Sequence, residues 1–193
     1  NLTMSCGSDR TSFFLSAGST NQSGIIVGPN NRYDRETVRL KATHNLFSSL
    51  SLNGNLSYTD GRGNFVQKGS NTSGLLLGSL RTPPEFNNNP YLSPTSGLQQ
   101  SYRFRNPTPA SFDGSRGYDN PLFTANTDGN KSELGRFISQ LGADWTPLEW
   151  LKVTDTLNAD YYNYWRLETL PRTPSSHPNR LVPRVDINNL QLN

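Results

Sequence analysis

Apolar and polar side chains alternate strictly over nine residues in the middle of the chain. From Leu50 to Tyr58, leucine, glycine and tyrosine take every second position, and serine or asparagine takes the positions between. Successive side chains of a strand point to opposite faces, so this segment has one apolar and one polar face. Residues 33–46 repeat the pattern, and only residues 47–49 separate the two segments. The two segments are therefore predicted to form a hairpin with a tight turn.

Less regular alternation predicts four more strands, two before this hairpin and two well after it. In the last two strands the pattern has exceptions, with Ile138 on the polar face and Asp155 on the apolar one. All 13 prolines fall outside the predicted strands, as expected for a residue that cannot donate to a β ladder. The predicted strands cover residues 1–6, 11–22, 33–46, 50–59, 133–145 and 151–162.

The predicted connections alternate between short and long. Residues 7–10, 47–49 and 146–150 are short turns at one end of the strands, and residues 23–32, 60–132 and 163 onward are long connections at the other end. Outer-membrane β-barrels have this arrangement, with short periplasmic turns and long extracellular loops. The longer alternating segments also reach the 9 to 11 residues that cross a bilayer when tilted. Aromatic residues gather near the strand ends, as in the interfacial girdles of such barrels: Tyr33, Phe47, Tyr58, Trp145, Trp150, Tyr161, Tyr162, Tyr164 and Trp165.

These features predict an all-β fold, a partial transmembrane antiparallel β-barrel with long extracellular loops. The whole chain, residues 1–193, is then a fragment of one barrel domain in which residues 60–132 form the longest loop. A soluble β-sandwich also shows alternation, but its core needs bulky interdigitating side chains, whereas lipid accepts small ones such as Ala42 and Ala143. Six strands cannot close a usable lumen, and lipid cannot satisfy an open sheet edge. Flanking sequence is therefore expected to supply further strands.

Composition narrows the class of protein. The mean hydropathy is −0.68, which is low for a packed globular interior. The 18 basic and 15 acidic residues form no basic run, so nucleic acid is not an expected partner. The single cysteine, Cys6, excludes an internal disulfide framework, and no run of apolar residues is long enough for a membrane helix. The start at Asn1 has no signal-peptide pattern, which favours an internal fragment or a processed piece.

No constellation of catalytic residues emerges from the sequence, so no enzyme activity, cofactor or metal is predicted. The two histidines are far apart, and His44 lies on a predicted apolar face near a turn. A ligand surface is expected instead in the lumen and in the long loop, where flat rings accompany amide, carboxylate and guanidinium groups. The same residues would also allow the loop to fold on itself. The candidate substrate-binding residues are Arg81, Phe86, Tyr91, Tyr102, Arg103, Phe104, Asp119 and Asn120.

Several short motifs follow one another along the chain: GSDRTSFFLSAG at residues 7–18, NQSGII at 21–26, YDR at 33–35, RL at 39–40, LNGNLSY at 52–58, LRTPP at 80–84 and YDNP at 118–121. Their order resembles the barrel of SusC/RagA-type TonB-dependent outer-membrane transporters. The first two motifs are similar to a strand and loop of that family, the next three resemble its next hairpin, and the last two resemble parts of its long extracellular loop. Two positions depart from the pattern: Ser19 replaces an aromatic residue, and Ser23 replaces an acidic one.

The resemblance implies a function for the intact protein. Such transporters import a large solute, typically an oligosaccharide or peptide, through a barrel of about 22 strands filled by an N-terminal plug. The expected partners are outer-membrane lipid, the TonB energy-coupling complex acting through the plug, and a SusD-type surface lipoprotein. The plug domain, the energy-coupling box and the closing strand are not among these 193 residues. Two other functions stay open: a passive porin or surface adhesin barrel, and a soluble β-sandwich binding module.

Overall fold

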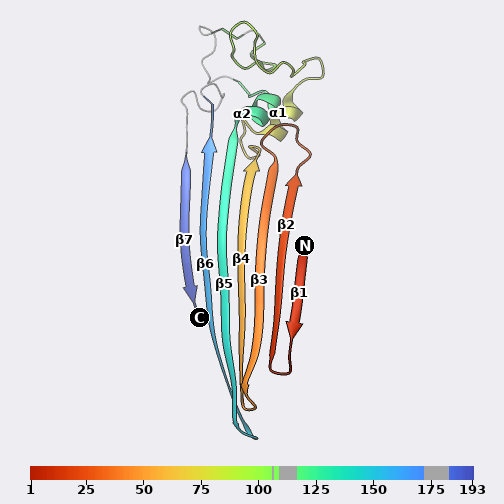
Figure 1. The fold of residues 1–193 in the computed structure, drawn as a ribbon. Helices are drawn as coiled ribbons and strands as arrows, with labels where there is room; N and C mark the ends of the chain where they lie inside the picture. The colour runs from red at the N-terminus through yellow and green to blue at the C-terminus, as the bar shows by residue number, and fades with distance from the viewer. Residues whose placement is uncertain (106, 109–116, 172–182) are drawn as a thin grey trace.

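The computed structural model describes residues 1–105, 107–108, 117–171 and 183–193. Its strands form one antiparallel sheet in which every strand pairs with its neighbours in sequence, in the order β1 to β7. Two short helices lie in the connection beyond one end of this sheet (Figure 1). The elements are β1 (Leu2–Gly7), β2 (Thr11–Ser23), β3 (Arg32–Phe47), β4 (Leu50–Phe65), α1 (Leu75–Arg81), α2 (Pro121–Thr127), β5 (Gly129–Leu148), β6 (Leu151–Thr169) and β7 (Arg184–Leu192).

The all-β prediction is confirmed, and all six predicted strands are present. The structure corrects their number and length, because β7 was not predicted and β4, β5 and β6 are longer than expected. The long connection is accordingly 66–128, not 60–132. Beyond Tyr58, β4 continues with Thr59, Asp60, Gly61 and Arg62, which are polar or small on both faces. Backbone pairing continues there although the two-residue alternation has ended, so hydropathy could not locate the strand ends.

One proline also departs from the prediction. Pro147 lies within the bounds of β5, close to its end. The register of β5 against β6 shifts between Trp145 and Leu148, so Pro147 stands where the ladder is irregular. A residue without an N–H group is tolerated at such a point because no regular ladder bond is lost.

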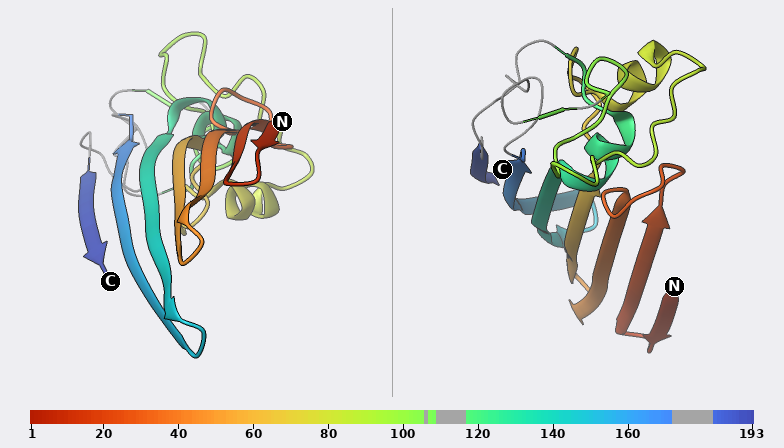
Figure 2. Two further views of the ribbon diagram at one scale, coloured as in Figure 1. Left: turned by 60° about the horizontal axis from the view of Figure 1, so that its bottom comes forward. Right: turned by 90° about the horizontal axis from the view of Figure 1, so that it is seen from above.

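The alternation of short and long connections is confirmed. Residues 8–10, 48–49 and 149–150 form tight turns at one end of the sheet, and residues 24–31, 66–128 and 170–183 connect strands at the other end. Figure 1 shows the turns at the lower end and both helices beyond the upper end. Viewed along the strands, the sheet is a single layer (Figure 2).

The strand register defines an apolar face and a polar face. Directly opposed residues of adjacent strands point to the same side of a sheet. The apolar face carries a band of apolar side chains. Toward the long connections the band ends in one such row: Ala17, Val38, Tyr58, Phe137, Tyr161 and Leu190. We call this band the apolar belt. On β4 it extends from Leu50 to Tyr58, and Ser139, His44 and Asp155 are exceptions within it.

Above the apolar belt the same face becomes charged. The next rows toward the long connections hold ion pairs between neighbours on one strand, such as Arg32–Asp34 at 2.8 Å, Arg62–Asp60 at 3.0 Å and Arg184–Asp186 at 2.8 Å. We call these residues the charged collar: Arg32, Asp34, Glu36, Asp60, Arg62, Lys131, Glu133, Arg184 and Asp186. On β3 and β4 the face therefore changes from apolar to charged between two successive rows. On β5, β6 and β7 the next row holds Gly135, Asn163 and Asn188, and Trp165 and Leu167 of β6 lie among the charged residues farther along.

The buried core lies outside the sheet. Among the described residues, the buried hydrophobic side chains are Val66, Phe123, Ala125 and Leu170, all in or beside the long connections. Most large side chains of the belt are exposed, with Leu141 at 55% and Leu157 at 59% of their full surface. Neither described helix has the length and apolar character needed to cross a bilayer.

The register can be tested by a cysteine pair. Leu40 and Leu56 are direct partners, so their Cα atoms are about 4.5 to 5.5 Å apart, within disulfide range. In a Cys6→Ser background, Leu40→Cys with Leu56→Cys should oxidise fully, measured by loss of titratable thiol. The pair Leu40→Cys with Ser57→Cys is the control, because Ser57 points to the other face. Faster oxidation of the control pair would contradict the register.

Candidate functional site

The described residues of the connection 66–128, which are 66–105, 107–108 and 117–128, form a cap beyond the upper end of the sheet. Its helix α2 is attached to the β2–β3 connection through Asn30, whose Nδ2 donates to the carbonyl oxygens of Asp128 at 2.6 Å and Ala125 at 3.3 Å. Gly28 adopts a φ of 130° beside the same carbonyl of Ala125, which a side chain at this position would approach to 3.0 Å. Two long connections that are distant in sequence therefore pack as one unit.

Two of the predicted substrate-binding residues form the polar centre of the cap. Asn120 is fully buried, and its Nδ2 donates to the carbonyls of Gln100 at 2.6 Å and Asn88 at 2.8 Å. Its Oδ1 accepts from the backbone N–H of Leu122 at 2.8 Å, which caps α2. Asp119 is also buried and accepts from Gln99 Nε2 at 2.6 Å. These contacts hold three segments of the cap together.

Three other predicted residues come together around a tyrosine that was not predicted. The guanidinium carbons of Arg81 and Arg103 lie 4.1 Å and 4.8 Å from the centre of the Tyr118 ring. Tyr102 stacks on Tyr118 at 6.2 Å with an angle of 17° between the rings. Arg81 also donates to the carbonyl of Asn71 at 2.6 Å, which fixes its position. The sequence signal for Tyr118 was its place directly before Asp119 and Asn120.

The remaining predicted residues pack within the cap. Arg105 lies 5.7 Å above the ring of Phe86, and Tyr91 meets Phe123 edge to face at 6.4 Å. The ring of Phe104 fills the space where a side chain at position 117 would stand, so a larger residue there would displace this ring. The structure thus places all eight residues in the cap, and ligand binding by them stays a prediction.

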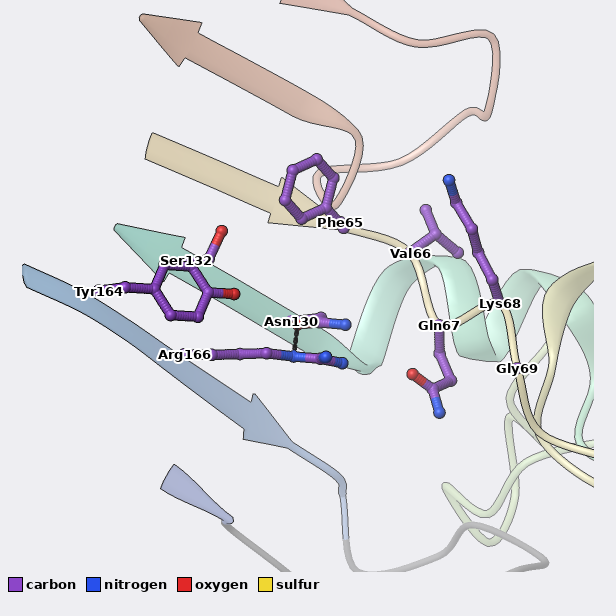
Figure 3. Close-up of a pocket in the computed structure, with 9 residues that line it drawn as sticks. All are labelled: Phe65, Val66, Gln67, Lys68, Gly69, Asn130, Ser132, Tyr164 and Arg166. Carbon is purple, nitrogen blue, oxygen red and sulfur yellow. Dashed lines mark hydrogen bonds between the residues drawn. The ribbon is translucent and has the colours of Figure 1, made fainter. Parts of the chain in front are cut away.

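A pocket of about 410 Å³ lies between the cap and the polar face of the sheet. Phe65, Asn130, Ser132, Tyr164 and Arg166 reach it from the ends of β4, β5 and β6, and residues 66–69 close it from the cap side (Figure 3). Most of these residues lie in the polar strand extensions that the sequence pattern did not reveal, which is why this pocket was not predicted.

The pocket combines flat rings, amides and two cations. Phe65 stacks on Tyr33 at 6.4 Å, and its ring covers Gly63, where any Cβ would clash with it. Arg166 donates from Nε to Asn130 Oδ1 at 2.8 Å, and its Nη2 lies 3.9 Å from Glu168. Lys68 is exposed at the rim. Aromatic faces, amides and charge-assisted donors suit a polar ligand with planar surfaces.

Among the described residues, no group of three His, Cys, Asp or Glu side chains is placed to hold a metal ion. A scan against protein-family models and a search of curated proteins gave no match to this chain. The sheet and the site define an all-β protein. It has an exposed apolar belt on one face, a polar opposite face, and a pocket under a folded cap.

The acid Asp128 makes the stability of the cap depend on pH. Its side chain is buried where α2 meets β5, and its Oδ2 has no hydrogen-bond partner among the described residues. Burial, followed by the negative charges of Asp119 and Glu168, raises the pKa of Asp128 from 3.8 to about 7, although the Thr127 hydroxyl acts in the opposite direction. The neutral acid is therefore the form that the folded cap favours.

The sign of the pH effect follows from this raised pKa. Between about pH 4 and pH 7 the folded cap binds more protons than the unfolded chain, so its free energy of unfolding falls as pH rises. Asp128→Asn should flatten this slope, measured by hydrogen exchange of residues 66–105 and 117–128 across that range. Asp9→Asn, in an exposed turn at the opposite end, is the control and should leave the slope unchanged. A slope that persists in the Asp128 variant would exclude this acid as its source.

Proposed function

We propose that this chain is an arc of an outer-membrane β-barrel whose apolar belt faces lipid and whose polar face lines a lumen. The sheet is open at β1 and at β7, and lipid offers no partner for unpaired backbone groups. Further strands, supplied by other parts of a longer protein, complete the barrel in this proposal. The short turns then face the periplasm, and the cap faces the outside of the cell.

The observation that carries the proposal is the uniform height of the apolar belt. On β4, β5 and β6 it covers nine positions each, at 50–58, 137–145 and 153–161. That length matches the 9 to 11 tilted residues of a membrane strand. In the following row the apolar side chains give way to Glu36 and Asp60 of the charged collar and to Gly135 and Asn163, as expected where strands leave the hydrocarbon. A sandwich gives no reason for the change to occur at one height on successive strands.

The transporter assignment rests on the resemblance to the SusC/RagA-type family and on the position of the pocket. In this proposal the pocket lies at the outer mouth of the lumen, beneath the cap. An arriving solute contacts this part of the polar face first. The solute is a large one, such as an oligosaccharide or peptide. Import is driven by the TonB complex through a plug domain, and a SusD-type lipoprotein covers the mouth.

Two alternatives make different predictions. A passive porin or adhesin barrel shares the apolar belt, but any solute uptake through it persists after the proton gradient is collapsed, whereas TonB-driven uptake stops. A soluble β-sandwich module is recovered as a monomer in the aqueous fraction without detergent. The charged collar favours a barrel over the sandwich, and the family resemblance favours the coupled transporter over the passive barrel.

A matched pair of substitutions tests the lipid-facing side. Leu141 lies at the centre of the apolar belt on β5, and its neighbour Gln140 is exposed on the polar face. Leu141→Arg should destabilise the assembled barrel by about 2 to 4 kcal/mol, because a cation at the bilayer midplane loses its hydration. Gln140→Arg places the same charge in water and should have little effect. The measurement is the amount of folded protein recovered in the outer-membrane fraction.

The proposal fails if the unsubstituted protein is recovered in the aqueous fraction, or if the two arginine variants assemble equally well. A defect confined to Leu141→Arg, in protein that otherwise fractionates with the membrane, is the expected result.

A further inference from the structure

Positive and negative charges are unevenly distributed over the polar face. On β5 and β6 each acid of this face lies near a base: Asp160 accepts from Arg136 Nε at 3.0 Å, Asp144 lies 3.3 Å from Lys152, and Glu168 lies 3.9 Å from Arg166. That half of the face is balanced, with three acids and three bases.

The other half of the face carries unbalanced cations. Arg35, Arg39 and Lys41 are exposed on the polar face of β3, and we call them the β3 column. β1 to β4 lie wholly within the described residues, and their polar faces carry no acid. The acids Asp34, Glu36 and Asp60 belong to the opposite face.

The surroundings of the β3 column are hydroxyl, amide and aromatic groups. Arg39 is flanked by Ser16 and Ser57, and its Nε donates to Asn55 Oδ1 at 3.1 Å. The cations are spaced by two and four residues, about 7 Å and about 13 Å along an extended strand.

Aromatic rings stand at both ends of the β3 column. Phe14, an apolar exception on the polar face of β2, is the direct partner of Lys41, and both line a hollow of about 550 Å³. At the other end, Tyr33 stacks on Phe65, which lines the pocket that Arg166 and Lys68 also border. The β3 column therefore has rings beside both of its ends, and the ring pair at its upper end connects it to the pocket.

We propose that the β3 column binds an acidic oligosaccharide, with sugar carboxylates on Arg35, Arg39 and Lys41 and sugar faces on the flanking rings. This inference rests on the proposed function, because it takes the polar face as the surface that the solute meets. Serine, threonine and asparagine side chains both donate and accept, as sugar hydroxyls do. An acidic peptide also carries carboxylates but lacks sugar faces to stack on the flanking rings, so it serves as the competing ligand in the test.

The test is equilibrium binding of a uronic-acid tetramer to the protein purified in detergent, at low and at physiological salt. Arg35→Gln, Arg39→Gln and Lys41→Gln together should weaken binding about tenfold at low salt and flatten its salt dependence. The control variant carries Arg32→Gln, Arg62→Gln and Arg184→Gln in the charged collar, which removes the same net charge from the opposite face. Its affinity should change less than about twofold.

Two further ligands complete the test. The fully methyl-esterified tetramer has no charge and should bind the unsubstituted protein more weakly than the uronate does. Its affinity should be the same for the β3-column variant and for the unsubstituted protein. The proposal is overturned if the unsubstituted protein binds no uronate, if both triple variants lose affinity equally, or if a glutamate tetrapeptide binds more tightly than the uronate. Binding in detergent does not depend on membrane insertion. Failure of the oligosaccharide proposal is therefore distinguishable from failure of the barrel proposal, which membrane fractionation tests.

Discussion

The antiparallel hydrogen-bond ladder decides which side chains share a face, and the remaining features of the molecule depend on it. Its register is regular from β2 to β6 and shifts only beside the short turns. A slip of one residue would move every belt leucine to the polar face. The same ladder aligns Val38, Tyr58 and Phe137 in the row where the apolar belt ends. A single layer with this much exposed apolar surface needs an apolar surrounding, and in our proposal lipid supplies it.

The cap is held by a different kind of interaction. Its centre is a network of buried amides and acids around Asn120, and hydrophobic burial is limited to a few side chains. Such a network gives a defined shape only when its members are hydrogen-bonded. Asp128 adds a pH dependence to it, because the folded cap favours the neutral form of this buried acid. The cap is therefore expected to open more easily as pH rises from about 4 to 7.

Strand segments in which apolar and polar residues alternate could be predicted from the sequence. Strand segments without this alternation were not predicted. Residues 50–58 indicated a strand because one of their faces is apolar, whereas residues 59–64 continue the same strand with polar or small residues on both faces. The pocket residues Phe65, Asn130 and Arg166 lie in such extensions, so they were not predicted. The loop residues were chosen by chemical type, and type alone could not distinguish Asn120, buried in the cap, from the exposed Arg103. Pairing partners such as Phe14 and Lys41 required the register.

Accessibility along one face of β4 tests the central claim most directly. In a Cys6→Ser background, single cysteines replace Leu52 and Leu56 in the apolar belt, and Asp60 and Arg62 in the charged collar. Protein in its native membrane is then treated with a thiol reagent that does not enter lipid. The account predicts protection at the two belt positions and rapid labelling at the two collar positions. Equal labelling at all four positions, or protection that continues through Arg62, would contradict a lipid boundary between Tyr58 and Asp60.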